Sequence, residues 1–109
     1  VTLQPRDRIR FAVNAGGAKY LLIASRDSAG VFSVYYPFGG QQSQAVGDLR
    51  ELPGAVELDA TLGSERLVAA FSDEPLTAGQ LEAALQADAK SPTVAGARLV
   101  TMEVVKVAP

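Results

Sequence analysis

The stretch YLLIASRDSAGVFSVYYP, residues 20–37, contains two apolar segments on either side of the turn sequence Asp27-Ser28-Ala29-Gly30. The first segment is apolar on both faces from Leu21 to Ala24, which favours a strand in the middle of a sheet. In the second segment Phe32, Val34 and Tyr36 fall on one face, because successive side chains of a strand alternate. A short loop that ends in glycine is a common hairpin connection. The stretch therefore predicts a central β-hairpin.

Strand patterns also occur on both sides of this hairpin. Residues 8–13 alternate, with Ile9, Phe11 and Val13 apolar, and residues 55–60 alternate in the same way. Residues 65–72 and 97–107 are rich in side chains typical of buried strands, and in the last stretch Val100, Met102 and Val104 share one face. Residues 1–7 form an irregular lead-in, and part of residues 49–52 is expected to pair as a short edge strand.

One helix is predicted between the last two strands. Thr77 is a favourable N-cap, and Gln80 stands at the third helical position, where it completes a capping box. Leu76 and Leu81 are spaced for a hydrophobic staple across this cap. The apolar stripe of the helix consists of Ala78, Leu81, Ala84 and Leu85, and Asp88 occupies the next position along it.

These elements predict a mainly β fold. We expect an antiparallel β-sandwich, or a partly open barrel, of six to seven strands with one helix before the last strand. At 109 residues the chain has the length of a single domain, residues 1–109. Because it begins with Val1 rather than Met, we expect it to be a part of a larger chain.

Composition excludes several classes of function. The chain contains no His and no Cys, so it lacks the commonest general base, the best nucleophile and the commonest metal ligands. We therefore expect no cofactor and no metal site. The net charge is −2, and only Arg6, Arg8 and Arg10 are clustered, so nucleic-acid binding is not expected. No apolar run is long enough to insert this segment into a membrane.

Acidic residues offer the remaining chemistry. Glu57 and Asp59 share the outer face of one predicted strand, about 7 Å apart, a separation that suits glycoside hydrolysis. Asp73 and Glu74 offer oxygen ligands to a cation, although such residues more often complete a turn before a helix. A Ser-Lys dyad is not indicated, because no Ser-x-x-Lys spacing occurs and Lys19, Lys90 and Lys106 have no evident partner for it. A hydrolase is the least favoured interpretation, because exposed strand positions are usually polar.

The best candidate site is a group of aromatic residues that runs into a glycine-rich loop. Tyr35 and Phe38 are followed by Gly39, Gly40 and Gln41, in an irregular segment that extends from residue 37 to residue 53. If both rings are exposed, they form a platform for a sugar or an anchor for a protein partner. The alternative is that Tyr35 packs under the loop with its hydroxyl at the surface. A loop of this length in a compact domain either carries a function or is an irregular connection without one.

Several phrases, in a fixed order, resemble a bacterial domain family of unknown function. They are PRDRIRF (5–11), YL (20–21), DSAG (27–30), YP (36–37), ELPG (51–54), GSERL (63–67) and FSDEP (71–75). The family usually has glycine where this chain has Arg6, so we expect that turn to differ. Members are appended to envelope and signalling proteins, among them caspase-like proteases, protein kinases and anti-sigma factors. No catalytic residues are attributed to the family.

Together these observations predict a non-catalytic interaction or sensing module of a larger bacterial envelope or signalling protein. Its partners are expected to be other proteins or other domains of the parent chain. The resemblance implies a periplasmic or cell-envelope location, with a cytoplasmic location as the alternative. A second hypothesis is a small-ligand or carbohydrate-binding domain that uses residues 35–44. A hydrolase that uses acidic residues is the third.

Overall fold

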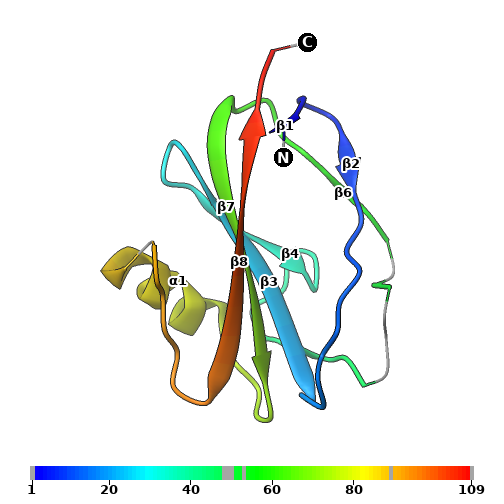
Figure 1. Ribbon diagram of the computed structural model, residues 1–109, viewed down its shortest axis with the longest axis vertical. Coiled ribbons are helices and arrows are strands. Elements are labelled where there is room, and N and C mark those ends of the chain that lie inside the picture. Colours follow the sequence, from blue (N-terminus) through cyan, green and yellow to red (C-terminus); the bar gives the residue numbers. More distant parts are fainter. Residues whose placement is uncertain (1, 48–50, 53, 89, 109) are drawn as a thin grey trace.

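In the computed structural model, the predicted hairpin forms β3 (Tyr20–Asp27) and β4 (Phe32–Tyr36), and β3 lies inside the main sheet (Figure 1). The structure describes residues 2–47, 51–52, 54–88 and 90–108. Besides the hairpin, these residues form two long strands, one helix and four short strands: β1 (Thr2–Leu3), β2 (Arg8–Ile9), β5 (Gln44–Ala45), β6 (Val56–Glu57), β7 (Gly63–Ser72), α1 (Ala78–Ala87) and β8 (Ala97–Lys106).

The main sheet is mixed, which corrects the prediction of a purely antiparallel sandwich. Its strands follow the order β1-β8-β7-β3-β4, and β5 pairs with the first residues of β3. All of these pairs are antiparallel except β1 and β8, which run parallel. Within the described residues, the sheet does not close into a barrel. The residues expected to form an irregular lead-in therefore supply a parallel strand.

The opposite layer contains less strand than predicted. Residues 8–13 and 55–60 keep their alternating burial, but only Arg8–Glu57 and Ile9–Val56 pair in a ladder, and Ala12 forms a single bridge with Glu51. Alternation reports which side of a segment is buried, and it does not require a backbone partner. The predicted pairing within residues 49–52 is this bridge at Glu51, while residues 49 and 50 lie outside the described part. With four two-residue strands, the described strand count is eight rather than six or seven.

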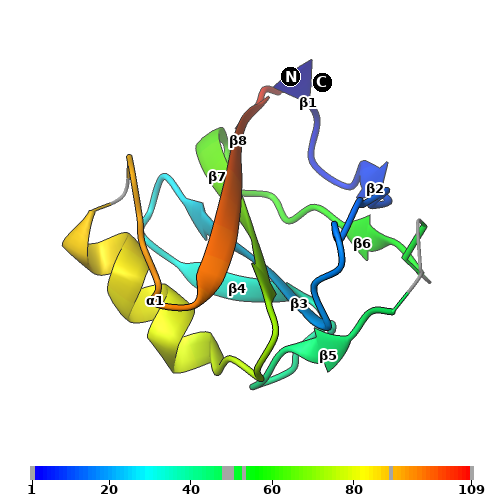
Figure 2. The same cartoon turned by 60° about the horizontal axis from the view of Figure 1, so that its bottom comes forward.

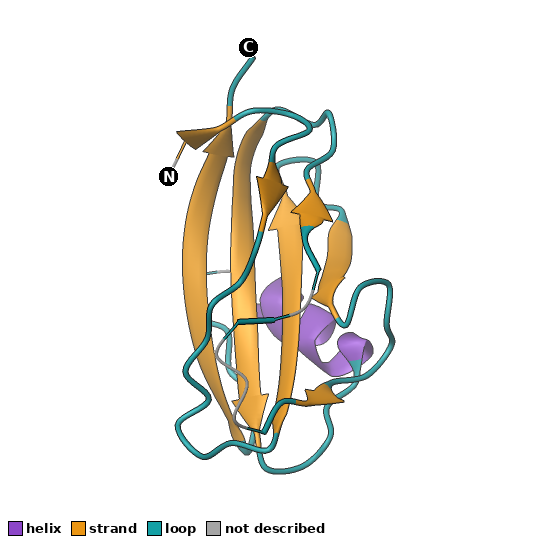
Figure 3. Ribbon diagram, turned by 90° about the vertical axis from the view of Figure 1, so that its right-hand side faces the viewer, coloured by secondary structure: helices purple, strands orange, loops and turns teal. Residues whose placement is uncertain are grey.

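The sheet has a core on each face. On the helix face, Leu22, Ala24, Val68 and Ala70 pack against Leu76, Leu81 and Leu85 of α1 and its cap. On the other face, called here the loop face, Leu21, Ile23, Tyr36 and Phe71 pack against Ala15, Val46 and Leu52. Figures 2 and 3 show α1 on one side of the sheet and the β2–β6 ladder with its flanking loops on the other.

A β-bulge at Tyr35 changes the predicted orientation of the second hairpin strand. Ile23 pairs with Tyr36, but Ala24 pairs with Val34, so Tyr35 is an extra residue in β4. Phe32 and Val34 therefore pack on the helix face, whereas Tyr36 belongs to the loop-face core. The prediction that all three share one face is wrong, because strict alternation has no means of indicating an inserted residue.

The helix begins as predicted. The Thr77 hydroxyl accepts a hydrogen bond from the backbone of Gln80, and the Gln80 side chain accepts one from the backbone of Thr77. Leu76 and Leu81 are both buried in the helix-face core, as the staple requires. The stripe ends at Leu85, since Asp88 is the C-cap and is exposed.

Candidate functional site

The loop that follows β4 is held by backbone contacts to the start of α1. The Ala78 amide donates to the Gln41 carbonyl at 2.7 Å, and Ser43 exchanges hydrogen bonds with Leu76 at 2.7 and 2.8 Å. Gly39 has a φ of +67°, and a Cβ at Gly40 would lie 2.7 Å from the Pro37 ring. Three of the residues predicted for the site, Gly39, Gly40 and Gln41, thus shape and anchor this loop.

The two aromatic members of the predicted site lie in different environments. Phe38 is 79% exposed, whereas the Tyr35 hydroxyl points inward and donates a hydrogen bond to the Glu65 carboxylate. The rings of both residues line a hollow of about 230 Å³, together with Phe11, Tyr36 and Leu52. Because its hydroxyl is engaged with Glu65, Tyr35 presents only its ring to this hollow. The alternative interpretation placed this hydroxyl at the surface, and its hydrogen bond to the buried Glu65 side chain contradicts that placement.

Tyr36, which also lines this hollow, carries an unexpected buried polar group. Its side chain is buried, and within the described ranges its hydroxyl has no hydrogen-bond partner. A buried polar group without a partner is rare in folded proteins, because it loses its bonds to water on folding. The hollow is thus lined by the exposed Phe38 ring and by the Tyr36 side chain, whose buried hydroxyl has no partner among the described residues.

A buried ionic cluster closes one end of the sheet. Lys106 and Glu65 are each 1% exposed at the side chain and form an ion pair at 2.9 Å, and Lys106 also binds Asp59. The partners of Lys106 are thus two carboxylates rather than the serine of a Ser-Lys dyad. The cluster joins β7, β8 and the segment after β6 to the bulge residue Tyr35 of β4. Since its inner members are sealed from solvent, we assign the cluster a structural role.

This cluster shifts the pKa of three of its members. Burial of Lys106 lowers its pKa, but hydrogen bonds to Asp59 and Glu65 outweigh burial and leave the pKa above its ordinary value. The hydrogen bond from Lys106 lowers the pKa of Asp59. Burial, together with the hydrogen bond to Glu65, raises the pKa of Tyr35 far above its ordinary value. Asp59 is thus held as an ion-pair partner, while Glu57 lies exposed opposite Arg8.

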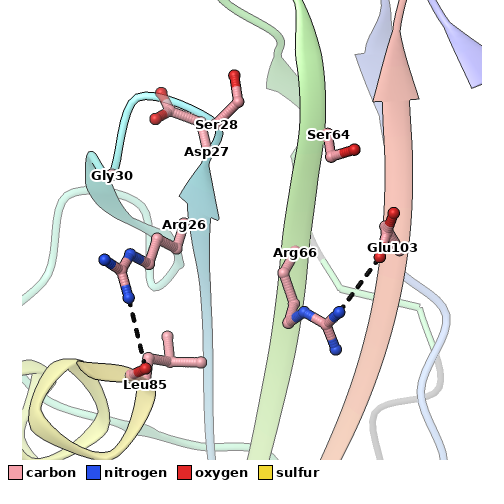
Figure 4. Close-up of a pocket in the computed structure, with 8 residues that line it drawn as sticks. All are labelled: Arg26, Asp27, Ser28, Gly30, Ser64, Arg66, Leu85 and Glu103. Carbon is pink, nitrogen blue, oxygen red and sulfur yellow. Dashed lines mark hydrogen bonds and ion pairs between the residues drawn. The ribbon is translucent and has the colours of Figure 1, made fainter. Parts of the chain in front are cut away.

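Another hollow, of about 390 Å³, lies on the helix face beside the hairpin turn. Arg26 and Arg66 are directly opposite each other on β3 and β7, and both line it. Figure 4 shows their guanidinium groups pointing apart, Arg26 toward the Leu85 carbonyl and Arg66 toward Glu103. Because the two cations do not converge, the hollow does not present a single anion site.

Among the strands that the structure describes, β8 has the longest edge without a neighbouring strand, and this edge is called here its outer edge. Within the described residues, β1 pairs only with Val105 and Lys106, so the outer edge from residue 97 to residue 104 has no strand beside it. Val100 and Met102 lie on the loop face of this strand and are 48% and 52% exposed. In Figure 3, β8 is the outermost long strand, and β1 covers only its upper end.

Sequence reasoning missed that Val100 and Met102 lie at a free edge. Their alternation with Thr101 and Glu103 predicted a strand with one apolar face, and such a face normally enters the core. Here the loop-face core ends over β7 and β3, and does not extend to the middle of β8. The alternation within residues 97–104 gives no signal of which strands lie beside β8.

Comparison with protein-family models, curated proteins and solved structures found no match to this chain. The resemblance to a bacterial domain family therefore stays a prediction. Among the described residues, no group of three or more acidic side chains is placed to hold a metal ion. In the same part of the chain, no helix combines the length and the apolar character that crossing a membrane requires.

Proposed function

We propose that this chain is a non-catalytic interaction module, and that it binds an extended segment by strand addition at β8. The observation that supports the proposal is the outer edge from residue 97 to residue 104, which is free within the described ranges. An unpaired edge presents a row of amide and carbonyl groups that another strand can bind. We further propose that the module serves a larger bacterial envelope or signalling protein.

The side chains of β8 favour an alternating partner segment. Val100 and Met102 present apolar surface on the loop face, while Thr101 and Glu103 present polar groups on the helix face. A segment with apolar residues on alternate positions buries these two apolar side chains and keeps its polar residues beside Thr101 and Glu103. Natural edge strands often avoid such pairing with lysine or proline, and residues 97–104 contain neither.

Selection from a displayed library of random linear peptides tests the proposal. The bait is the immobilised chain, the comparison variant is Met102→Lys, and the matched control is Leu62→Lys. Leu62 is 48% exposed and lies in the turn before β7, so the control places the same charge on a similarly exposed apolar side chain. We expect alternating peptides that bind the wild-type chain and Leu62→Lys but not Met102→Lys. Peptides that bind all three chains equally would contradict strand addition at β8.

The hollow beside Phe38 supports a second candidate function, the binding of a small ligand such as a sugar. The supporting observation is the exposed Phe38 ring in a hollow that is also lined by Tyr36, whose hydroxyl has no partner among the described residues. A sugar ring stacks on an aromatic face and accepts hydrogen bonds from hydroxyl groups. The volume of the hollow, about 230 Å³, suits a small group rather than a long chain.

Glycan-array binding by three chains tests this candidate. We expect Phe38→Ala and Tyr36→Phe each to reduce a signal that the wild-type chain gives. Tyr36→Phe removes only the unpartnered hydroxyl, so its stability should equal or exceed that of the wild type. A ligand whose binding is the same in all three chains does not use this hollow.

A further inference from the structure

The edge of β8 is complementary to itself, and we propose that its occupant is a second copy of this chain. The two β8 strands would run antiparallel, and the two-fold axis would pass midway between the two copies of Thr101. This inference rests on the proposed function, because it names the partner that binds the same edge. The two sheets then form one continuous sheet, with α1 of both copies on the same side, since a two-fold axis perpendicular to a sheet preserves its faces.

Pairing about Thr101 sets the register of the other residues. Residues that face each other across two antiparallel strands lie on the same face of the sheet. With Thr101 opposite Thr101 of the second copy, Val100 faces Met102 and Met102 faces Val100. The four half-exposed apolar side chains then form one cluster on the loop face. A register centred on Val100 would instead place Arg98 opposite Met102 and leave the cluster incomplete.

Residues 98–104 of the free edge take part in this register. Residues 98–104 are centred on Thr101, and β1 occupies the next positions, Val105 and Lys106. Ala97 of each copy would face Val105 of the other, where Thr2 of β1 already pairs, so the paired stretch is residues 98–104 and Thr2 gives way to Ala97 at each end. Gly96, with a φ of +77°, turns the chain immediately before β8. The two β1 strands thus limit the paired stretch at both ends.

The charges along the edge do not oppose this pairing. Arg98 would face Val104, and Glu103 would face Leu99, so no like charges stand directly opposite each other. Glu103 also keeps its ion pair with Arg66 of its own copy, at 3.2 Å. One pair of edge strands buries less surface than a standard interface, so we expect a dissociation constant in the micromolar range.

Single-cysteine variants test the register directly, because the natural chain contains no cysteine. Thr101→Cys places two thiols opposite each other on the axis, where antiparallel Cβ atoms are about 5 Å apart. Glu103→Cys is the matched control on the same face of the same strand. Its two thiols are offset by four residues, roughly 13 Å along the strand, which is beyond the reach of a disulfide. We expect disulfide-linked dimers from Thr101→Cys and none from Glu103→Cys under mild oxidation.

Sedimentation of the wild-type chain provides a measurement that needs no substitution. We expect a concentration-dependent dimer, weakened at least tenfold by Met102→Lys and unchanged by Leu62→Lys. A dimer that cross-links equally well in the Glu103→Cys variant, or one that Met102→Lys does not weaken, would overturn the assignment. A chain that stays monomeric would also overturn it. In that case alternating peptides that still bind β8 would leave the proposed function intact, with another protein as the partner.

Discussion

Replacing the buried Lys106 with methionine should lower the free energy of unfolding by about 3–5 kcal/mol. The Lys106 side chain is 1% exposed, and it neutralises Glu65, which is equally buried. Methionine fills a similar volume but leaves the Glu65 carboxylate without its cation in a site that water does not reach. Asp59 also loses its partner, but its side chain is 59% exposed and water can solvate it. The cost therefore arises mainly at Glu65.

A loss of this size is large for a domain of 109 residues, whose total stability is of the order of 5–15 kcal/mol. Urea denaturation followed by circular dichroism measures it, and thermal melts should shift downward by roughly 10–20 °C. Lys19→Met is the matched control, because the Lys19 side chain is exposed. We expect it to change the free energy of unfolding by less than about 0.5 kcal/mol.

The double variant Lys106→Met/Glu65→Gln separates charge from packing. Glutamine keeps an acceptor for the Tyr35 hydroxyl but removes the unpaired charge, so most of the lost stability should return. A single variant that costs less than about 1 kcal/mol would refute the buried ion pair. A double variant as unstable as the single variant would show that the loss comes from the packing of β8.

Three further predictions concern the backbone, the helix cap and pH. Arg6 has a φ of +71°, a conformation that favours glycine, so Arg6→Gly should raise the free energy of unfolding by about 0.5–1 kcal/mol in urea melts, and a loss would contradict this strain. Thr77→Ala removes the cap of α1 and should lower the free energy of unfolding by about 1 kcal/mol, whereas Thr77→Ser should retain most of this stability. The native chain holds the protons of Tyr35 and Lys106 where the unfolded chain releases them, because both pKa values are raised. The free energy of unfolding should therefore fall as pH rises above about 10, and Tyr35→Phe should make the fall shallower; an equal slope in both chains would exclude a contribution from Tyr35.

Within the candidate site, the sequence identified residue types but not their arrangement. It placed Tyr35 and Phe38 together because they are three positions apart beside a glycine-rich loop. The bulge at Tyr35 separates their roles, since it directs one hydroxyl to Glu65 and leaves the Phe38 ring in solvent. The partner of Tyr35 is 30 positions away along the chain, so no local pattern contains this information.

The sequence alone determined the features that neighbouring residues control. These are the hairpin of β3 and β4, the capping box at Thr77 and Gln80, and the faces of the long strands, because turn preference, capping and alternation act over a few residues. Only the tertiary structure decided the parallel pairing of β1, the burial of Lys106 and the free edge of β8. Each of these depends on a partner far along the chain, or on the lack of one among the described residues. Asp59 reaches Lys106 across 47 positions. Such distant groups come together only when the chain folds. Their contacts then determine which polar groups are buried together and which strand edge has no neighbour.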